Sequence, residues 1–309
     1  MANAVIWIFN QAVEEMFAVS FGSLACNAPD VWDGWLKIII DAGISDLMRA
    51  WLRSFAGEGV HVLPVSLPQP SEVVGGQRHL PAQIMLARLR LPVLVDRMIR
   101  AGFLPPVERF LHVDADTAFF ASPQELTEAS WGAEQIWAVK EWDWVGEKEQ
   151  MVTEDLRMAR DHCFISTAQD RHRRLAAVLG MSTEDLLMVP SYNSGVWVAM
   201  PGDHLTNPWE ETYRKLRAAD ETLGGSFINP HSSEESALSL AIHRGAIRIK
   251  PLPRQYNYLP PREPRDWPSD TVIAHFVTFH LNHHWPAYRR WYAQRDSLQR
   301  NGLWPWDVT

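Results

Sequence analysis

Short apolar runs alternate with helical patterns through the first part of the chain, and this alternation constrains the fold more than any other feature. Consecutive parallel strands need a crossover segment between them, so the pattern is typical of an α/β protein with helices on both faces of a mostly parallel sheet. The pattern predicts strands at Val5–Phe9, Trp35–Ile40 and Val60–Val65, and helices at Glu14–Ala25 and from an N-cap at Ser45 to about Phe55.

The rest of the chain continues in the same manner with one long interruption. Residues 141–190 are polar, with helical character and no strand signal, and we expect them to form an insertion over the sheet. We expect one domain over residues 1–285, with 141–190 as an acceptor-side insertion, and a helical tail over 286–309. The further predicted elements are a helical stretch at Gln83–Arg100 interrupted at Pro92, strands at Arg109–Val113, Tyr192–Met200 and Val272–Val277, and helices at Glu234–Arg244 and Pro286–Arg300.

Charge and cysteine usage argue against several classes of function. The formal net charge is −8, so the chain lacks the bulk attraction to phosphates that nucleic-acid binders have. Cys26 and Cys163 are too few for a disulfide scaffold and have no metal-ligand spacing. The sequence shows no signal peptide and no transmembrane segment, and we expect a cytoplasmic protein.

The predicted tail carries aromatic and basic side chains together, with Trp291 beside Arg289, Arg290 and Arg295. Such a helix can touch a membrane surface or an anionic acceptor. More often a helix of this composition packs its aromatic side chains on the core and exposes its arginines, and we expect that arrangement here.

Two aspartates, Asp114 and Asp116, follow the predicted strand Arg109–Val113 in the string FLHVDADTAFF. Ligands of open α/β sheets bind beyond the carboxyl ends of the strands, so acidic side chains at this point are candidates for function. Two carboxylates one residue apart can share a divalent cation that bridges the phosphates of a ligand and acts as a Lewis acid. An ordinary turn or N-cap explains the same spacing equally well.

Several strings follow one another along the chain in the order of one enzyme family. They are VIWIFNQAVEEMFAVSFGSL, IIIDAGISDLMRAWL, ARLRLPVLV, FLHVDADTAFF, YNSGVWVAM, EESALSLAIH, PRQYNYLP and VIAHF. Together they resemble glycosyltransferase family 8, the retaining GT-A enzymes that include lipopolysaccharide galactosyltransferases and glycogenin. The resemblance runs with gaps from Val5 to about Trp285. It implies a Rossmann-like GT-A fold and transfer of a hexose, glucose or galactose, from UDP-glucose or UDP-galactose with retention of configuration.

The resemblance also implies a metal site and a donor site. Asp114 and Asp116 match the two metal-binding aspartates, and His275 matches the histidine that completes the site. The implied cofactor is Mn²⁺ or Mg²⁺, and an imidazole ligand favours Mn²⁺. The residues expected to contact the nucleotide-sugar donor are Ile8, Asn10, Arg88, Asp114, Ala115, Asp116, Glu141 (or Asp143), Asn193, Glu234 and His283 (or His284).

Glu234 and Glu235 are the candidate catalytic residues. Glu234 stands where the family has an aspartate, and we expect it to hydrogen-bond sugar hydroxyls. Glu235 stands where the family has a glutamine beside the anomeric carbon, and a carboxylate there can stabilise an oxocarbenium-like species or attack it. The sequence leaves double displacement and a front-face reaction both open. Acids at the start of a helix are also favoured by the helix dipole, without any catalytic role.

The chain departs from the family's pattern at several donor positions. Val13 stands where the family has an aromatic residue that stacks on uracil. Asn10 replaces a base-reading aspartate, although an amide offers both a donor and an acceptor. Thr278 replaces a glycine, and the lysine that holds the diphosphate in the family is missing.

These departures leave alternatives to the main prediction. One is a catalytically degenerate nucleotide-sugar-binding protein, and another is a transferase with a non-uridine donor. A nucleotidyltransferase is disfavoured, because residues 10–15 contain no glycine for a phosphate loop. The acceptor is not indicated: a saccharide, a natural product, a protein side chain and a modified nucleic-acid base all suit.

Overall fold

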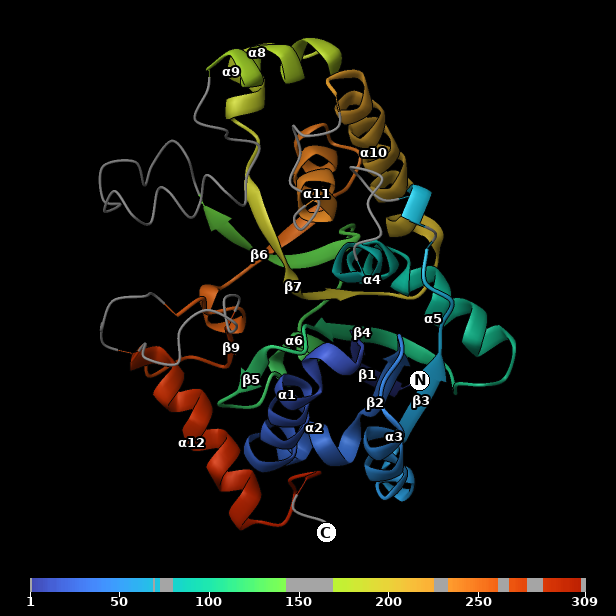
Figure 1. Cartoon of the computed structure of the whole chain (residues 1–309), viewed down its shortest axis with the longest axis vertical. Helices are drawn as coiled ribbons and strands as arrows, with labels where there is room; N and C mark the ends of the chain where they lie inside the picture. The colour runs from blue at the N-terminus through green and yellow to red at the C-terminus, as the bar shows by residue number, and fades with distance from the viewer. Residues whose placement is uncertain are drawn as a thin grey trace.

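A seven-stranded mixed sheet forms the centre of the computed structural model, which describes residues 2–68, 70–72, 80–142, 169–224, 233–260, 267–276 and 286–306 (Figure 1). The strand order is β3-β2-β1-β4-β7-β6-β8. The first four strands in this order are parallel, whereas β7 is antiparallel to β4 and β6, and β8 is parallel to β6. The strands are β1 Ala2–Phe9, β2 Leu36–Asp41, β3 Val60–Pro64, β4 Val107–Val113, β6 Ile136–Trp142, β7 Ser191–Ala199 and β8 Ile249–Leu252.

Helices cover both faces of this sheet, as the alternating pattern predicted. In Figure 1, α1, α2 and α3 lie below the sheet, and α4, α5, α10 and α11 lie above it. The α/β class and the mostly parallel central sheet are therefore confirmed. The helices are α1 Glu14–Asn27, α2 Pro29–Gly34, α3 Asp46–Arg53, α4 Leu80–Leu89, α5 Leu91–Arg100, α6 Glu125–Glu128, α8 Gln169–Val178, α9 Thr183–Leu187, α10 Asp203–Thr222, α11 Ser233–His243 and α12 Pro286–Arg300.

Strand β1 shows how the sheet separates two hydrophobic cores. Ile6 and Ile8 face the core formed with α4, α10 and α11, whereas Trp7 and Phe9 face the core formed with α1, α3 and α12. Successive side chains of a strand point to opposite faces, so a strand that is apolar throughout must be covered on both sides. This is why VIWIF forms a central strand.

A second, two-stranded sheet lies beside the first. Strands β5, Thr117–Phe119, and β9, Ile273–His275, pair antiparallel, with Thr117 opposite His275. β5 begins directly after the two aspartates of the predicted metal site. The predicted late strand at Val272–Val277 is thus present in part, but it pairs with β5 and not with the central sheet.

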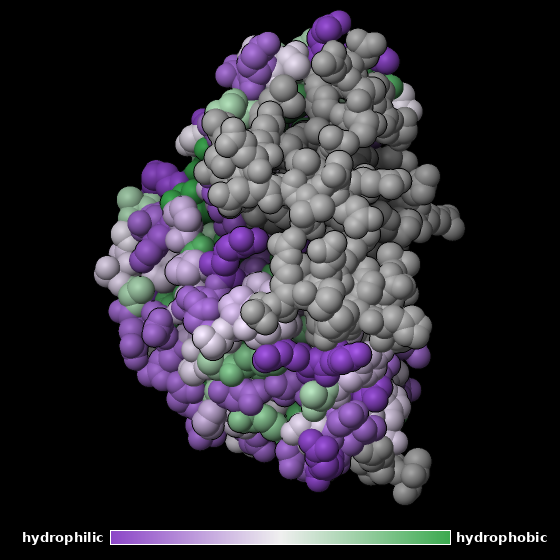
Figure 2. All heavy atoms as spheres, turned by 90° about the vertical axis from the view of Figure 1, so that its left-hand side faces the viewer, coloured by the Kyte–Doolittle hydropathy of each residue, from purple (hydrophilic) through white to green (hydrophobic). Residues whose placement is uncertain are grey.

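The C-terminal helix α12 packs on the outside of α1. Trp291 is fully buried, and Leu298 lies so close to Gly22 of α1 that a side chain at that glycine would overlap it. Arg289 and Arg290 are exposed, and hydrophilic side chains predominate on the lower described part of the face where α12 lies (Figure 2). Trp291 thus packs on the core and Arg289 and Arg290 are exposed, as expected for this helix, whereas Arg295 is only partly exposed.

The structure differs from the sequence-based expectations in several elements. The stretch Gln83–Arg100 forms two helices, because Pro92 lies in the first turn of α5, where its missing N–H costs no hydrogen bond. The strands β6 and β8 and the helices α2 and α10 were not predicted. Since β6 ends at Trp142, the statement that residues 141–190 contain no strand is wrong for its first two residues, while α8 and α9 confirm the helical part. Residues 143–168 of this insertion lie outside the described residues.

No helix in the described part of the chain is both long enough and apolar enough to cross a membrane.

Candidate functional site

The carboxyl ends of β1 and β4 meet at the point where the order of the parallel strands reverses. The chain passes from β1 outward to β2 and β3, and then returns to place β4 on the other side of β1. Open α/β sheets bind their ligands in the crevice at such a switch point. Asn10 follows β1 here, with Oδ1 accepting a hydrogen bond from the Ala12 amide at 3.1 Å, and Asp114 follows β4.

Asp114 and Asp116 stand on a tight turn between β4 and β5. The Thr117 amide donates to the Asp114 carbonyl at 3.3 Å, and the Phe276 amide donates to the Asp116 carbonyl at 2.9 Å. The second of these bonds holds the turn to the end of β9. Residues Asp114 and Asp116 therefore reach the neighbourhood of His275 through the pairing of β5 with β9.

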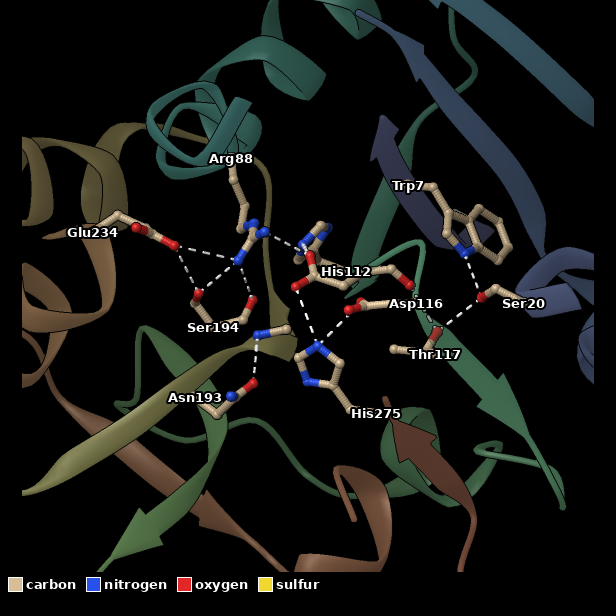
Figure 3. Close-up of polar contacts among 12 residues, drawn as sticks. Trp7, Ser20, Arg88, His112, Asp116, Thr117, Asn193, Ser194, Glu234 and His275 are labelled. Carbon is tan, nitrogen blue, oxygen red and sulfur yellow. Dashed lines mark hydrogen bonds and ion pairs between the residues drawn. The ribbon is translucent and has the colours of Figure 1, made fainter. Parts of the chain in front are cut away.

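Three potential metal ligands converge at this turn (Figure 3). Nε2 of His275 lies 3.1 Å from Oδ1 of Asp116 and 3.6 Å from Oδ2 of Asp114. One ligand atom from each of the three residues lies within 4.8 Å of the others. These three residues form a group that could hold a metal ion, and it is the group of this kind found among the described residues. The prediction that these three side chains meet agrees with this geometry.

The donor set and its spacing fit a divalent cation. Ligands at about 2.1 Å in octahedral geometry lie about 3 Å from their neighbours, close to the separations seen here. Burial alone would lower the pKa of His275, but Asp116 and then Asp114 raise it above its ordinary value. Two carboxylates therefore face the imidazole at a point that would also attract a cation. Two carboxylates with one imidazole are a donor set that can bind a divalent metal ion.

The antiparallel direction of β7 brings its first residues to the same end of the sheet. The Asp114 amide donates to the Gly195 carbonyl at 2.7 Å, so the turn is bonded to β7 on its other side. Oδ1 of Asn193 accepts hydrogen bonds from the Gly195 amide and from Nδ2 of Asn257, both at 2.8 Å. Asn257 fixes which way the Asn193 amide faces, and the sequence did not single it out.

Arg88 of α4 joins the two halves of the site (Figure 3). Nη2 lies 2.8 Å from Oδ1 of Asp114, and Nη1 donates to the Ser194 hydroxyl at 2.7 Å and lies 3.4 Å from Oε1 of Glu234. The arginine is only 6% exposed, so these contacts occur with little competition from water. Arg88 therefore does not lie on a solvated face of the helix.

Asp114 is held as a carboxylate from several sides. Burial alone would raise its pKa, but the charge of Arg88 and a hydrogen bond with His112 keep it far below the ordinary range. His112 is fully buried on β4, and its Nε2 lies 3.3 Å from Oδ1 of Asp114. Since Arg88 and His112 both use Oδ1, Oδ2 is the oxygen that faces His275. The i, i+2 spacing of His112 and Asp114 puts both on one side of a strand, which was a signal that the sequence analysis did not use.

Glu234 and Glu235 begin α11 and meet β7 at Ser194. The Ser194 hydroxyl lies 3.2 Å from Oε1 of Glu234 and 3.1 Å from Oε1 of Glu235, and the Ser194 amide donates to Glu235 at 3.0 Å. Burial, opposed by Arg88 and reinforced by the charge of Glu235, raises the pKa of Glu234 to about 8. Among the described residues, Oε2 of Glu234 has no hydrogen-bond partner although it is buried.

The remaining predicted site residues lie around this cluster or outside the described part. Ala115 is buried within the turn, and Ile8 and Asn10 belong to the neighbouring end of β1, without a hydrogen bond to the cluster among the described residues. Glu141 lies on β6, and its side chain is not among those described. His283 and its alternative His284 lie outside the described residues.

Comparison with known proteins places the fold. No protein-family model matches the sequence, and no curated protein matches it. Among solved structures, galactosyltransferase LgtC in complex with donor and acceptor sugar analogs matches with a TM-score of 0.57 and 13% identity, over 97% of this chain and 100% of LgtC. The fold is that of the GT-A glycosyltransferases.

Further GT-A structures match at similarly low identity. Mouse xyloside xylosyltransferase 1 has a TM-score of 0.53 and 10% identity, over 90% of this chain and 99% of its own. The glycosyltransferase GlyE of Streptococcus pneumoniae TIGR4 has a TM-score of 0.51 and 12% identity, over 98% of this chain and 64% of its own. The expected GT-A fold is confirmed, and in this GT-A fold the acidic cluster lies at the carboxyl end of β4.

Proposed function

We propose that this protein is a retaining glycosyltransferase, of the kind found in family 8, that moves a hexose from a UDP-sugar to an acceptor with the aid of Mn²⁺ or Mg²⁺. The observation that carries the proposal is the convergence of Asp114, Asp116 and His275 beside Glu234 and Glu235. LgtC, which has a similar fold, is a galactosyltransferase whose structure contains donor and acceptor sugar analogs. Glucose and galactose are the donor sugars we propose.

Asp114, Asp116 and His275 would hold the cation through Oδ2, Oδ1 and Nε2 respectively. When bound, the cation supplies Lewis-acid stabilisation of the negative charge on the departing nucleoside diphosphate. Arg88 and His112 keep Asp114 ionised and turn its Oδ2 toward the cation site. Because the cluster is preorganised by buried contacts, little reorganisation is needed when charge develops.

Glu234 and Glu235 would act on the transferred sugar. Glu234 holds a proton at neutral pH and can therefore both donate to and accept from sugar hydroxyls. Glu235 would place a carboxylate near the anomeric carbon, either as a nucleophile or as a stabiliser of positive charge. Donor contacts from Ile8, Asn10, Ala115 and Asn193 belong to the same proposal, as do Glu141 and His283.

A donor screen tests this function. Nucleotide sugars are incubated with the protein and Mn²⁺, and thermal shift, donor hydrolysis and transfer to saccharide acceptors are measured in parallel with an EDTA control. We expect a UDP-hexose to stabilise the protein and to be hydrolysed only in the presence of metal. NMR spectra recorded early in the reaction should show that the released sugar has the same anomeric configuration as the donor, before mutarotation mixes the two anomers. No stabilisation by any nucleoside diphosphate would refute the proposal.

A second candidate function is nucleotide-sugar binding without turnover. Val13 is packed against the hydrophobic core and offers no aromatic ring for a base, which is the observation that favours it. The same screen separates the two candidates. A pure binder would be stabilised by a UDP-sugar and Mn²⁺ but would release no sugar.

A further inference from the structure

We propose that Trp7 and Ser20 are positioning residues of the metal site, acting through a buried hydrogen-bond chain that ends on the backbone of Asp114. This inference rests on the proposed function, because it concerns the metal site of that function. It assigns a role to two residues of β1 and α1 that lie outside the catalytic cluster. Figure 3 shows the chain beside that cluster.

The chain consists of three hydrogen bonds in series. Nε1 of Trp7 donates to Oγ of Ser20 at 2.9 Å, Ser20 and Thr117 share a bond of 2.8 Å between their hydroxyls, and the Thr117 hydroxyl donates to the Asp114 carbonyl at 2.8 Å. Trp7, Ser20 and Thr117 are all fully buried. No water competes for these groups, so an unmade bond would leave a buried polar atom unsatisfied.

The direction of every bond in the chain is fixed by the groups at its ends. An indole N–H can only donate and a carbonyl oxygen can only accept. The Thr117 hydroxyl therefore gives its proton to Asp114, and Ser20 must give its own to Thr117 while accepting from Trp7. A chain with a single proton arrangement holds the turn in one orientation, and bonds that point the same way reinforce one another.

The hydrogen-bond chain affects both sides of the metal site, the two carboxylates and the imidazole. Thr117 closes the turn that bears Asp114 and Asp116, and in the β5–β9 pair it lies opposite His275. A shift of Thr117 would therefore move the two carboxylates relative to the imidazole. Removing a group that orients a metal ligand through hydrogen bonds typically lowers metal affinity by about 10- to 100-fold.

Helix α1 also provides a matched control. Ser23 lies one turn after Ser20, is equally buried, and accepts a hydrogen bond from the Phe119 amide at 2.9 Å. It holds β5 from the same helix, two residues beyond Thr117, but it is not part of the chain to Asp114. Ser20→Ala and Ser23→Ala each remove one buried hydroxyl from one helix face and leave the same small side chain.

The experiment measures Mn²⁺ affinity by electron paramagnetic resonance or calorimetry, with thermal unfolding measured on the same samples. We expect both alanine variants to lose similar thermal stability. Ser20→Ala should raise the Kd for Mn²⁺ about 10-fold, whereas Ser23→Ala should leave it within about twofold. If Ser20→Ala does not fold, Ser20→Cys supplies the same test, because a thiol of similar size is a weak donor.

Thr117 supplies the rescue that separates positioning from packing. Thr117→Val keeps the shape and loses the hydroxyl, and it should weaken Mn²⁺ binding as much as Ser20→Ala does. Thr117→Ser keeps the hydroxyl and should restore affinity to within about twofold of the unchanged protein. The double variant Ser20→Ala/Thr117→Val should bind Mn²⁺ no more weakly than either single variant, because the effects of substitutions within one hydrogen-bond chain are not additive.

The outcomes distinguish this inference from the function on which it rests. If the unchanged protein binds Mn²⁺ and Ser20→Ala binds it equally well, the positioning role is refuted and the metal site stands. Equal losses in Ser20→Ala and Ser23→Ala would also refute it, because they would indicate a general effect of α1 on β5. If the unchanged protein binds no Mn²⁺, the proposed metal site is refuted, and the inference with it.

Discussion

Gly195 lies directly against the imidazole ring of His275. A Cβ on residue 195 would overlap that ring, 2.5 Å from Nδ1, and would lie 2.9 Å from Oδ1 of Asn193. Both separations are shorter than carbon atoms tolerate. The Gly195 backbone also bonds to Asp114 and Asn193, so the strand cannot move aside without disturbing them. The glycine of YNSGV is therefore required by the histidine of VIAHF.

We expect Gly195→Ala to displace His275 and weaken Mn²⁺ binding, by about 10-fold or more, because one ligand is moved out of place. The measurement is the Mn²⁺ titration by electron paramagnetic resonance, with circular dichroism to verify the fold. Gly34→Ala is the control, since nothing lies within 4 Å of a Cβ at that position. Unaltered Mn²⁺ affinity in Gly195→Ala would contradict the placement of His275.

Asp116→Ala should abolish metal-dependent turnover and leave the fold intact. The Asp116 side chain is 24% exposed and contacts His275 at 3.1 Å, so its loss creates no large buried defect. Lewis-acid stabilisation is worth several kcal/mol, and we expect a loss on the order of 10³-fold in kcat. Donor hydrolysis with Mn²⁺ is the assay, and thermal unfolding is the control. Activity near that of the unchanged protein would exclude Asp116 as a ligand.

Arg88→Met should destabilise the metal-free protein by about 3–5 kcal/mol, because it leaves the buried Asp114 carboxylate without its positively charged arginine partner. The free energy of unfolding in urea with EDTA is the measurement. Arg100→Met is the matched control on the neighbouring helix. Its ion pair with Asp96 is largely exposed on the arginine side, and its loss should cost about 0.5 kcal/mol or less. Equal costs at the two positions would argue against a buried ionic centre.

Glu234 should make the stability of the protein fall as pH rises. Its pKa is raised to about 8 in the folded state by burial, from 4.5 in the unfolded chain, so the folded state binds more protons between these values. The free energy of unfolding then decreases with pH through this window, by at most about 1.4 kcal/mol per pH unit, and levels off above it.

Glu234→Gln removes this titration with little change of shape. We expect the stability of the variant relative to the unchanged protein to increase from pH 5.5 to pH 8 in EDTA. Urea unfolding at four pH values provides the comparison. Glu211→Gln is a control, because that carboxyl is exposed on α10 and its pKa is lowered by Lys215. Parallel pH profiles for Glu234→Gln and the unchanged protein would show that Glu234 does not titrate in this range.

Much of the fold could be predicted from local patterns. The apolar strings around Ile6 and Ile39 form β1 and β2 because an all-apolar strand is stable only with both faces covered. Ser45 caps α3 as expected, with its hydroxyl accepting from the Met48 amide at 3.1 Å. The position of Asp114 and Asp116 after β4 also followed from the strand that precedes them.

Other elements could not be predicted from their own residues. β6 contains Lys140 and Glu141, and β8 is IKPL, so neither has the uninterrupted apolar run of a central strand. Each is held by its neighbours, β6 by β7 and β8 by β6. Strand propensity depends on such context more than helix propensity does.

The sequence alone determined the α/β alternation, the cores on both faces of the sheet and the carboxylate pair at the end of β4, because periodicity and strand ends are local properties of the chain. Only the tertiary structure decided that β7 runs antiparallel to β4 and that β9 pairs with β5. Those two pairings bring Ser194 and His275 to Asp114. They depend on the packing of segments far apart in the chain, which no local pattern encodes.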